Sequence, residues 1–364
     1  MSFPTEYEQI LERIEDVDPV AYGRTRNFQN GAVTRLSPYI SRGVLSTKQV
    51  LEYVLERGYK ASSIEKFIQE LAWRDYWQQI WIAKGDAINE DLRHPQPEVQ
   101  NHEIPQAISA AETGIDAIDS GINELYETGY MHNHMRMYVA AVACNMAKSH
   151  WREPARWMYY HLLDGDWASN ALSWQWVAGS NSNKKYVANQ ENINKYFSSS
   201  QRDTFLDVPY SVLTTMDVPE QLSITERLEL KTPLPSSPNL EIEESKPTLV
   251  YNYYNLDPKW HEAESANRVF LLEPSVFERY PVSQRAMDFV LELSKNIDGI
   301  QVFIGEFNEL KKQTGASPIF FKEHPLNTNY KGTEEPRYWM FSVTGYHRSF
   351  FAFWKKCQKE MKAW

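Results

Sequence analysis

Residues 128–176 concentrate side chains that are costly to bury beside one another. Among the polar and tryptophan members of this stretch are Asn133, Arg136, Asp164, Asp166, Asn170, Trp174 and Trp176. A helix that only needs an apolar core is built from Leu, Ala and Ile, whereas here amide, guanidinium and carboxylate groups lie within apolar helical runs. Buried polar groups need hydrogen-bond partners. A ligand rich in donors and acceptors would supply them, so this stretch is the first candidate binding site.

A second candidate site is the loop that precedes Pro38. Thr34, Arg35 and Ser37 combine hydroxyls, backbone amides and a guanidinium, and such groups can cradle a diphosphate. A capped turn that leads into the helical pattern beginning near Ser46 explains the same residues. The sequence alone leaves both interpretations open.

A third candidate lies on a helical run that contains Glu70, Trp73 and Arg74. Glu70 and Trp73 are three residues apart and therefore share a helix face. An aromatic plane beside a carboxylate suits a stacked, hydrogen-bonding ligand such as a base. The alternative is a solvated Glu next to a core Trp.

A metal site is not expected. Asp164 and Asp166 flank a glycine and resemble paired Mg²⁺ or Ca²⁺ ligands, but no further acid or amide follows at loop-ligand spacing. His132 and His134 are two residues apart, so they point to different helix faces. We expect both histidines at the surface or in a supporting position near the site.

Composition limits the classes of protein to which the chain can belong. It has 364 residues, 42% of them apolar, which is enough for two domains with large cores. A net charge of −10 argues against a general nucleic-acid binder, although a local basic patch remains compatible with it. Two cysteines exclude a disulfide framework. With no membrane-length apolar run and no signal-peptide pattern, we expect a cytoplasmic protein without a membrane span and favour a monomer.

The elements that must position these residues divide the chain into three regions. Residues 1–205 are dominated by helical periodicity, as in 64–82. Residues 206–246 are rich in Pro, Ser and acidic residues and predict an extended linker. Residues 247–364 alternate strand-like and helical patterns, which predicts a smaller α/β domain with a parallel sheet. The strand-like runs are TLVYNYY, RVFLLE, IQVFIG, SPIFF and YWMFSV.

The motifs TGYMHN, MRM, WRE, DGD and N-x-x-x-W-Q-W, in this order and spacing, resemble the flavin-binding helical domain of the DNA photolyase/cryptochrome family. The resemblance covers about residues 22–197. It implies a mainly α fold, FAD as the cofactor and light-driven flavin chemistry. It also implies damaged DNA as the partner.

The resemblance assigns three groups of residues to FAD. The segment that holds the FAD phosphates would comprise Tyr22, Thr34, Arg35, Leu36 and Ser37. The residues that line the flavin and lesion pocket would be Glu70 and Arg74. The residues around the isoalloxazine and ribose would be Asn133, Arg136, Asp164, Asp166 and Asn170. Asn170 would face flavin N5 and Asp166 would accept from the ring N3–H, while Asp164 would pair with Arg136.

The resemblance also implies repair of cyclobutane pyrimidine dimers, by one-electron donation from photoexcited reduced flavin to a dimer flipped out of the duplex. Trp73 and Trp176 match the aromatic walls around the dimer, and Met137 matches a further contact. Glu70 matches the acid that hydrogen-bonds the dimer. Two alternatives are a cryptochrome-like blue-light photoreceptor without repair activity and a flavin in a purely structural role.

Electron supply to the flavin is assigned to Trp174 and Trp151, which match the inner and middle tryptophans of the family's relay. The outer tryptophan would fall at Glu98, so Trp157 or a nearby tyrosine is the alternative there. Phosphates of DNA would meet a groove to which four basic residues are assigned: Arg42, Arg152, Lys184 and Lys185.

The chain departs from the family's pattern in two further features, the phosphate loop and the order of the domains. Val33 stands where the family often has threonine. The family's α/β antenna domain precedes the helical domain, whereas here an α/β region follows it. That region is either a permuted antenna-like domain or an unrelated appendage, and no antenna-pigment residues are assigned.

Overall fold

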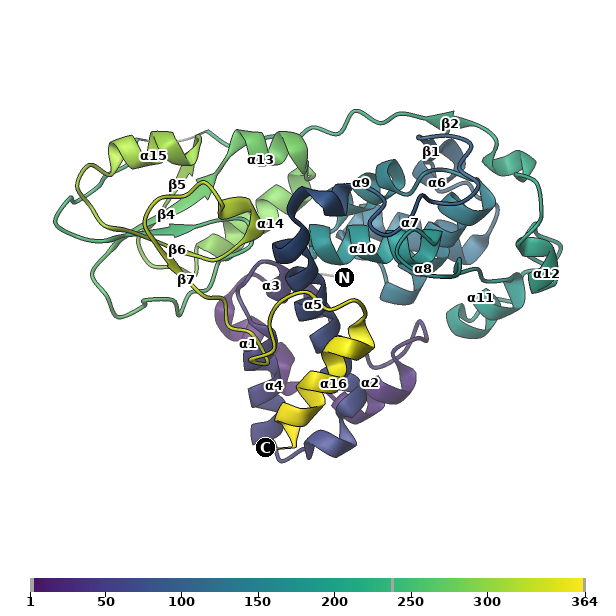
Figure 1. Ribbon diagram of the computed structural model, residues 1–364, viewed down its shortest axis with the longest axis horizontal. Coiled ribbons are helices and arrows are strands. Elements are labelled where there is room, and N and C mark those ends of the chain that lie inside the picture. Colours follow the sequence, from purple (N-terminus) through teal and green to yellow (C-terminus); the bar gives the residue numbers. More distant parts are fainter. Residues whose placement is uncertain (1–2, 237–238, 363–364) are drawn as a thin grey trace. The chain divides into compact units, whose positions relative to one another are not determined.

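The computed structural model describes residues 3–236 and 239–362, which form two compact units (Figure 1). Unit 1 consists of Val20–Val33 and Lys84–Leu230. Unit 2 consists of Thr34–Ala83 together with the described parts of Ser2–Pro19 and Lys231–Trp364. Both units are therefore discontinuous in sequence.

Unit 1 is helical, as predicted. Its main helices are α2 (Pro19–Thr25), α7 (Asp116–Thr128), α8 (Asn133–Ala141), α9 (Arg152–His161), α10 (Trp167–Ala178) and α11 (Gln190–Phe197), with the short α6 (Gln106–Ser109) and α12 (Tyr210–Leu213). Helix α8 runs on into a π-helical turn over Val142–Met146. Short 3-10 turns cover Gly85–Asn89 and Glu220–Leu222, and β1 (Ile104–Pro105) pairs with β2 (Thr225–Glu226).

Helix α10 forms the centre of unit 1 and packs against α8 and α9. The Asp166 carboxylate caps its N-terminus by accepting from the Ser169 N–H at 2.6 Å. The helix ends at Gly179, whose φ of 88° is the left-handed conformation that glycine adopts without strain. Because apolar residues surround most of its circumference, α10 is buried on nearly every side.

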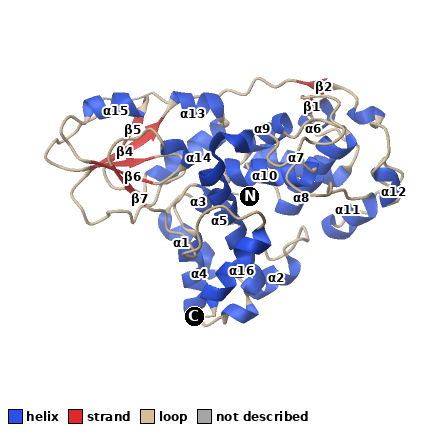
Figure 2. Ribbon diagram, in the orientation of Figure 1, coloured by secondary structure: helices blue, strands red, loops and turns tan. Residues whose placement is uncertain are grey.

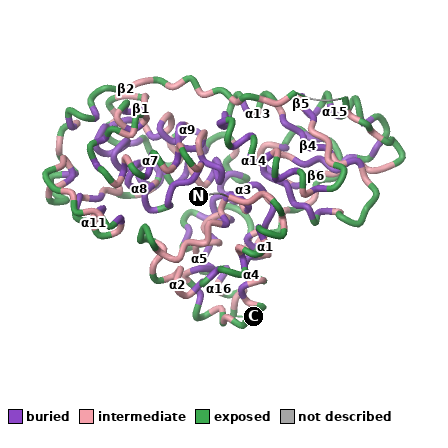
Figure 3. The backbone as a smooth tube through the Cα atoms, turned by 180° about the vertical axis from the view of Figure 1, so that it is seen from behind, coloured by how far each residue is buried: buried purple, intermediate pink, exposed green. Residues whose placement is uncertain are grey.

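Unit 2 contains a five-stranded parallel sheet with strand order β5-β4-β3-β6-β7 (Figure 2). The strands are β3 (Thr248–Tyr251), β4 (Asn267–Leu272), β5 (Ile300–Ile304), β6 (Ile319–Lys322) and β7 (Thr333–Glu335). Helices α13 (Pro274–Arg279) and α14 (Gln284–Ser294) connect β4 to β5, and α15 (Phe307–Gln313) connects β5 to β6. The predicted parallel α/β layer is confirmed, and the central strands β4 and β6 are largely buried (Figure 3).

One predicted strand is wrong. The run YWMFSV, residues 338–343, has no strand conformation, and the fifth strand is instead the polar segment Thr333–Glu335. An edge strand needs pairing on one side only, so it can form without an apolar pattern. The aromatic run is irregular because it packs side chains onto a helix, with the Phe341 and Trp354 ring centroids 6.2 Å apart.

Unit 2 also holds helices from both ends of the chain. These are α1 (Tyr7–Glu15), α3 (Ser37–Ser41), α4 (Thr47–Glu56), α5 (Glu65–Lys84) and α16 (Phe350–Met361), with 3-10 turns at Ala61–Ser63 and Pro325–Asn327. The predicted helix start near Ser46 is confirmed, because Ser46 and Gln49 form a capping box. Among the described helices, none is long and apolar enough to cross a bilayer.

The compact units do not follow the expected division at residues 205 and 247. Residues 34–83 cluster with the C-terminal α/β region, because α5 uses polar side chains to bind the C-terminal segment as well as apolar ones to fill a core. The predicted linker, 206–246, includes α12 and the β2 strand. Its residues 237–238 lie outside the described part of the chain. Leu240 and Ile242 pack against the apolar core of the sheet.

The carboxyl ends of β3 and β6, where open α/β sheets usually bind ligands, are filled by the chain itself. The Arg42 guanidinium lies 3.8 Å from the Tyr253 ring centroid and is fully buried. A Cβ at Gly43 would meet the Tyr254 carbonyl at 2.5 Å. Arg42, expected in a DNA groove, is instead part of the packing at this end of the sheet.

Candidate functional site

Helix α8 and the turn before α10 supply the paired charges of the first candidate site. Arg136 Nη2 lies 2.9 Å from Asp164 Oδ2, and Arg136 Nε donates to the Met131 carbonyl at 2.8 Å. The Asp164 side chain is 3% exposed. The predicted Arg136–Asp164 ion pair is therefore present, and its carboxylate is almost completely buried.

The tight turn around Gly165 fixes both acids of the DGD motif. A Cβ at Gly165 would come within 3.0 Å of the Tyr159 carbonyl and 3.1 Å of the Leu162 carbonyl. The turn directs Asp166 to the start of α10, where one carboxylate oxygen caps the helix. Asp166 therefore has a structural task in addition to the FAD contact predicted for it.

Three further predicted residues lie on α8 and α10. Asn133 is exposed and Met137 half-buried; they are four residues apart and share one face of α8. Asn170 Nδ2 donates to the Ala155 carbonyl at 2.8 Å, which fixes its amide against α9. Beside it, the Ser169 hydroxyl is buried and has no hydrogen-bond partner among the described residues. A polar ligand at this end of α10 would satisfy that hydroxyl.

The tryptophans of α10 differ in exposure. Trp174 is 2% exposed, whereas Trp176 is 39% exposed and lies 5.9 Å from the Tyr186 ring. An exposed indole on a rigid, buried helix is a ready stacking surface. Trp176 is therefore open to stacking, whereas Trp174 is enclosed by the protein.

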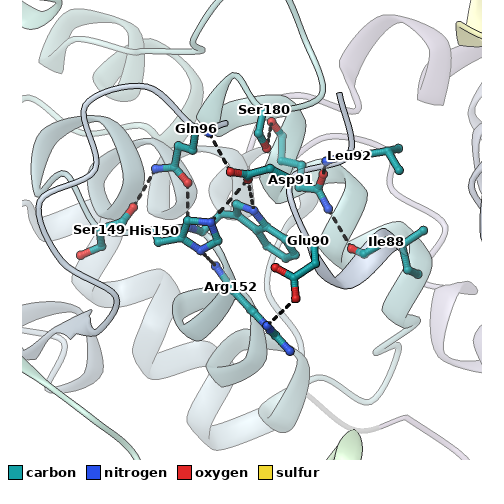
Figure 4. A network of polar contacts seen from close by, with 11 residues as sticks. Ile88, Glu90, Asp91, Leu92, Gln96, Ser149, His150, Arg152 and Ser180 are labelled. Carbon is teal, nitrogen blue, oxygen red and sulfur yellow. Dashed lines mark hydrogen bonds and ion pairs between the residues drawn. The ribbon is translucent and has the colours of Figure 1, made fainter. Parts of the chain in front are cut away.

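Trp151 is wholly buried and belongs to a polar network that sequence reasoning missed (Figure 4). Its indole Nε1 donates to Asp91 Oδ1 at 2.9 Å, and its backbone N–H donates to Gln96 Oε1 at 2.9 Å. Gln96 in turn donates its backbone N–H to Asp91 Oδ2 at 2.8 Å. Asp91 and Gln96 lie in a loop without periodicity, so no local signal links them to Trp151.

The same loop is anchored to α10. Gln175 Nε2 donates to the Ile88 carbonyl at 2.8 Å, and Gln175 Oε1 accepts from the Leu92 N–H at 3.0 Å (Figure 4). Trp167 Nε1 donates to Asn89 Oδ1 at 2.7 Å. These bonds hold the segment that carries Asp91 at a fixed place beside the helix.

Glu98, at the position of the family's outer tryptophan, binds two lysines. Its Oε2 lies 2.6 Å from Lys185 Nζ and 3.0 Å from Lys148 Nζ. Hydrogen bonds from Lys185 and then Lys148 lower the pKa of Glu98 to about 2. Lys185, assigned to a basic groove, is thus engaged by an ionised carboxylate. Trp157, the alternative outer residue, is buried and donates to the Tyr126 hydroxyl at 3.0 Å.

The predicted phosphate segment is divided between the units. Tyr22 lies on α2 in unit 1, and residues 34–37 belong to unit 2. Thr34 Oγ1 accepts from the Leu36 N–H at 3.3 Å, and Leu36 is 1% exposed. Arg35 Nε is buried without a hydrogen-bond partner among the described residues, and its φ is 55°. An unsatisfied guanidinium nitrogen in a loop fits an anionic group such as a phosphate.

Helix α5 carries the remaining predicted residues in unit 2. Glu70 is half-buried, with Oε1 3.1 Å from Lys66 Nζ, and Arg74 Nη1 donates to Ser41 Oγ at 2.6 Å. The Trp73 ring is stacked on Phe350 of α16, with centroids 3.6 Å apart and planes 9° apart. One face of Trp73 is therefore covered by the chain's own C-terminal helix.

The segment before α16 binds α5 through a row of polar contacts. Arg337 Nη1 donates to Gln78 Oε1 at 2.7 Å. The Met340 N–H donates to Asp75 Oδ2 at 3.1 Å, and the Gly345 N–H donates to Gln79 Oε1 at 2.7 Å. Asp75 is buried, and this desolvation raises its pKa to about 6. The sequence predicted α5 but not the partner of its polar side chains.

The surface placement considered for His132 and His134 is wrong, because both are buried in unit 1. His132 Nδ1 accepts from the His134 N–H at 3.2 Å and caps α8. His134 Nδ1 contacts the Asn27 carbonyl at 3.0 Å. Desolvation lowers the pKa of His132 to about 4, so the imidazole is neutral at physiological pH. Their aromatic neighbours, such as Phe197, could not be inferred from local spacing.

Comparison with known proteins finds similarity over a range that lies mainly in unit 1. Residues 67–204 match the model of the FAD binding domain of DNA photolyase. The deoxyribodipyrimidine photo-lyase of Alkalihalophilus pseudofirmus is 31% identical over 161 residues, 43% of this chain and 34% of that protein. The corresponding protein of Streptomyces griseus is 35% identical over 150 residues, 41% of this chain and 32% of that protein.

Among solved structures, the Synechocystis sp. PCC6803 cryptochrome aligns over 54% of this chain and 44% of that chain, with 26% identity and a TM-score of 0.47. The chain spans about a third of the length of the curated relatives named above. Residues 67–204 thus match an FAD-binding domain, that of DNA photolyase, and the cofactor that this match indicates is FAD. The parallel sheet of unit 2 lies outside the matched range.

Proposed function

We propose that the protein repairs cyclobutane pyrimidine dimers in DNA by light-driven electron transfer from reduced FAD. The observation that carries this proposal is the pair of indoles on α10, within the matched FAD-binding domain. Trp174 is buried, and Trp176, two residues further on, is exposed. An exposed indole can stack on a base of the dimer, and a buried indole can supply the electrons that reduce the flavin before repair begins.

For the cofactor, we propose that Asn133 and Asn170 contact the flavin ring and that the Arg136–Asp164 pair supports it. Asp166 would accept from the ring N3–H, and the phosphates would meet the residues of the N-terminal segment: Tyr22, Thr34, Arg35, Leu36 and Ser37. The buried Ser169 hydroxyl and Arg35 Nε, neither of which has a hydrogen-bond partner in the described part of the chain, support these assignments. When bound in its reduced form, FAD supplies a one-electron donor under light.

For the substrate, we propose that Trp176 stacks on the flipped dimer, with Met137 as a further contact. Stacking of this kind is worth about 1–3 kcal/mol per base. Glu70 would hydrogen-bond the dimer, and Trp73 would form a second aromatic wall. Removing the dimer from water shields the reacting bases and prolongs the charge-separated state.

The decisive assay uses holoprotein whose flavin has been reduced chemically, so that no internal relay is needed. Blue light should remove dimers from dimer-containing DNA. Trp176→Ala should weaken dimer binding by about 1–3 kcal/mol without loss of FAD, and Trp176→Phe, which keeps a stacking ring, should restore most of it. Failure of the wild-type protein to remove dimers, with reduced flavin bound, would refute the proposal.

A second candidate function is a blue-light photoreceptor without repair activity. The observation that favours it is the Trp73–Phe350 stack, because it covers one face of an indole that is proposed to contact the dimer. A light-induced change in protease sensitivity of the C-terminal segment, without dimer repair, would support this alternative. Dimer repair with an unchanged cleavage pattern would exclude it.

A further inference from the structure

The Trp151 indole differs from two other buried indoles of unit 1 in the acceptor that it uses. Trp167 donates to the neutral amide of Asn89, and Trp157 donates to a phenol hydroxyl. Trp151 Nε1 donates instead to a carboxylate oxygen of Asp91, at 2.9 Å. Hydrogen bonds to an ionised acceptor are shorter and stronger than neutral ones. An indole that loses an electron becomes a strong acid, so the choice of acceptor has chemical consequences.

The carboxylate is held in place from several sides (Figure 4). Asp91 Oδ2 accepts from the backbone N–H of Gln96, and Gln96 Oε1 accepts from the backbone N–H of Trp151. Gln96 therefore binds both Asp91 and Trp151. His150 Nε2 lies 3.4 Å from Asp91 Oδ1. The reacting N–H and its acceptor are therefore fixed relative to each other before any light is absorbed.

Asp91 also connects the buried indole to solvent. Trp151 is 0% exposed, whereas the Asp91 side chain is 21% exposed. His150 stacks on the exposed His102, with ring centroids 4.9 Å apart. The proton of Trp151 has no direct path to water, but it can leave the indole by transfer to Asp91.

We propose that Asp91 is the proton acceptor of an electron relay that ends at Trp151. The proposal rests on the proposed function, in which Trp174 and Trp151 supply electrons to the flavin. Glu98 stands where the relay would otherwise continue, and its side chain is an ionised carboxylate that cannot pass the charge on as an indole would. With no indole at position 98, we take Trp151 as the last residue of the relay, where the positive charge is neutralised.

With FAD bound in its oxidised form, Trp174 would give one electron to the flavin under light, and Trp151 would give one electron to Trp174, which is thereby restored. The Nε1–H bond of the Trp151 radical cation breaks, its proton forms a bond to Asp91 Oδ1, and its electron pair stays on nitrogen. A neutral indolyl radical and a carboxylic acid remain. A one-electron reductant such as a thiol from solution then restores Trp151, which takes back the proton from Asp91.

The test is flash-induced transient absorption of the holoprotein with oxidised FAD, which distinguishes the cationic from the neutral indole radical. The wild-type protein should form the neutral radical, more slowly in D₂O than in H₂O. Asp91→Asn removes the proton acceptor, so it should leave the cation in place, abolish the neutral radical and shorten the lifetime of charge separation. Glu90→Gln, which removes the neighbouring exposed carboxylate bound to Arg152, should behave as wild type.

Two results would overturn the proposal: a neutral radical formed equally fast in Asp91→Asn, or a wild-type protein whose indole radical stays cationic or never forms. If Asp91→Asn does not retain FAD, Asp91→Glu and the wild-type solvent isotope effect decide the question; a rate independent of D₂O would contradict it. Dimer repair with chemically reduced flavin needs no relay. Failure of repair and failure of proton transfer are therefore separate outcomes.

Discussion

Replacement of Phe350 by alanine tests whether the C-terminal helix is an integral part of unit 2. Phe350 is 2% exposed, stacks on Trp73 and meets the Tyr76 ring edge-on at 5.7 Å. Truncation of a buried phenylalanine typically costs about 3–5 kcal/mol, because apolar burial is lost and a cavity remains. We expect Phe350→Ala to lower the free energy of unfolding of unit 2 by about this amount.

The adjacent residue provides a matched control. Phe351 has the same side chain but is 68% exposed, so Phe351→Ala should change stability by no more than about 0.5 kcal/mol. Urea unfolding followed by tryptophan fluorescence measures both variants, since Trp73 and Trp354 lie beside Phe350. Equal effects of the two substitutions, or a cost below about 1 kcal/mol for Phe350→Ala, would refute the packing described for α16.

Three further predictions concern charge, a turn and a helix cap. Burial raises the pKa of Asp75 from 3.8 to about 6. Between pH 3.8 and about pH 6, the folded protein therefore holds a proton that the unfolded chain has released. The free energy of unfolding should fall by up to about 3 kcal/mol as pH rises through this window. Asp75→Asn should remove that slope in urea titrations between about pH 4 and 7, and an unchanged slope would contradict it. Gly165→Ala should destabilise the protein by about 1–3 kcal/mol, because its Cβ meets the Tyr159 carbonyl; a neutral effect in thermal melts would count against this tight turn. Asp166→Ala should cost about 1 kcal/mol in stability through loss of the α10 cap and should also reduce FAD retention on gel filtration, whereas Asp166→Asn should preserve the cap.

Much of the helical framework could be predicted from periodicity. The run 64–82 became α5, and most of residues 1–205, where helical periodicity dominates, form helices. Periodicity reports which faces of an element are apolar, and helices with one buried stripe reveal it strongly. The edge strand β7 shows the opposite case, because an exposed strand paired on one side carries no apolar alternation.

The candidate site also has some features that the sequence predicted and others that it could not. The order of the motifs identified the FAD-binding domain, and the Arg136–Asp164 pair was predictable because the resemblance names both partners. The Asp91 acceptor of Trp151 was not predictable. The two residues are separated by 60 positions, and a loop aspartate without periodicity gives no indication of the side chain that it will meet.

By itself, the sequence predicted a helical FAD-binding domain, the residues that we propose for the flavin, and Glu98 at the position where the family has its outer tryptophan. Only the tertiary structure decided how those residues are used. It joined α5 to the C-terminal segment, covered one face of Trp73 with Phe350, and placed the Asp91 carboxylate on the Trp151 indole. The physical reason is that local patterns encode which surfaces are buried, whereas the partner of each buried polar or aromatic group is set by packing between segments far apart in the chain.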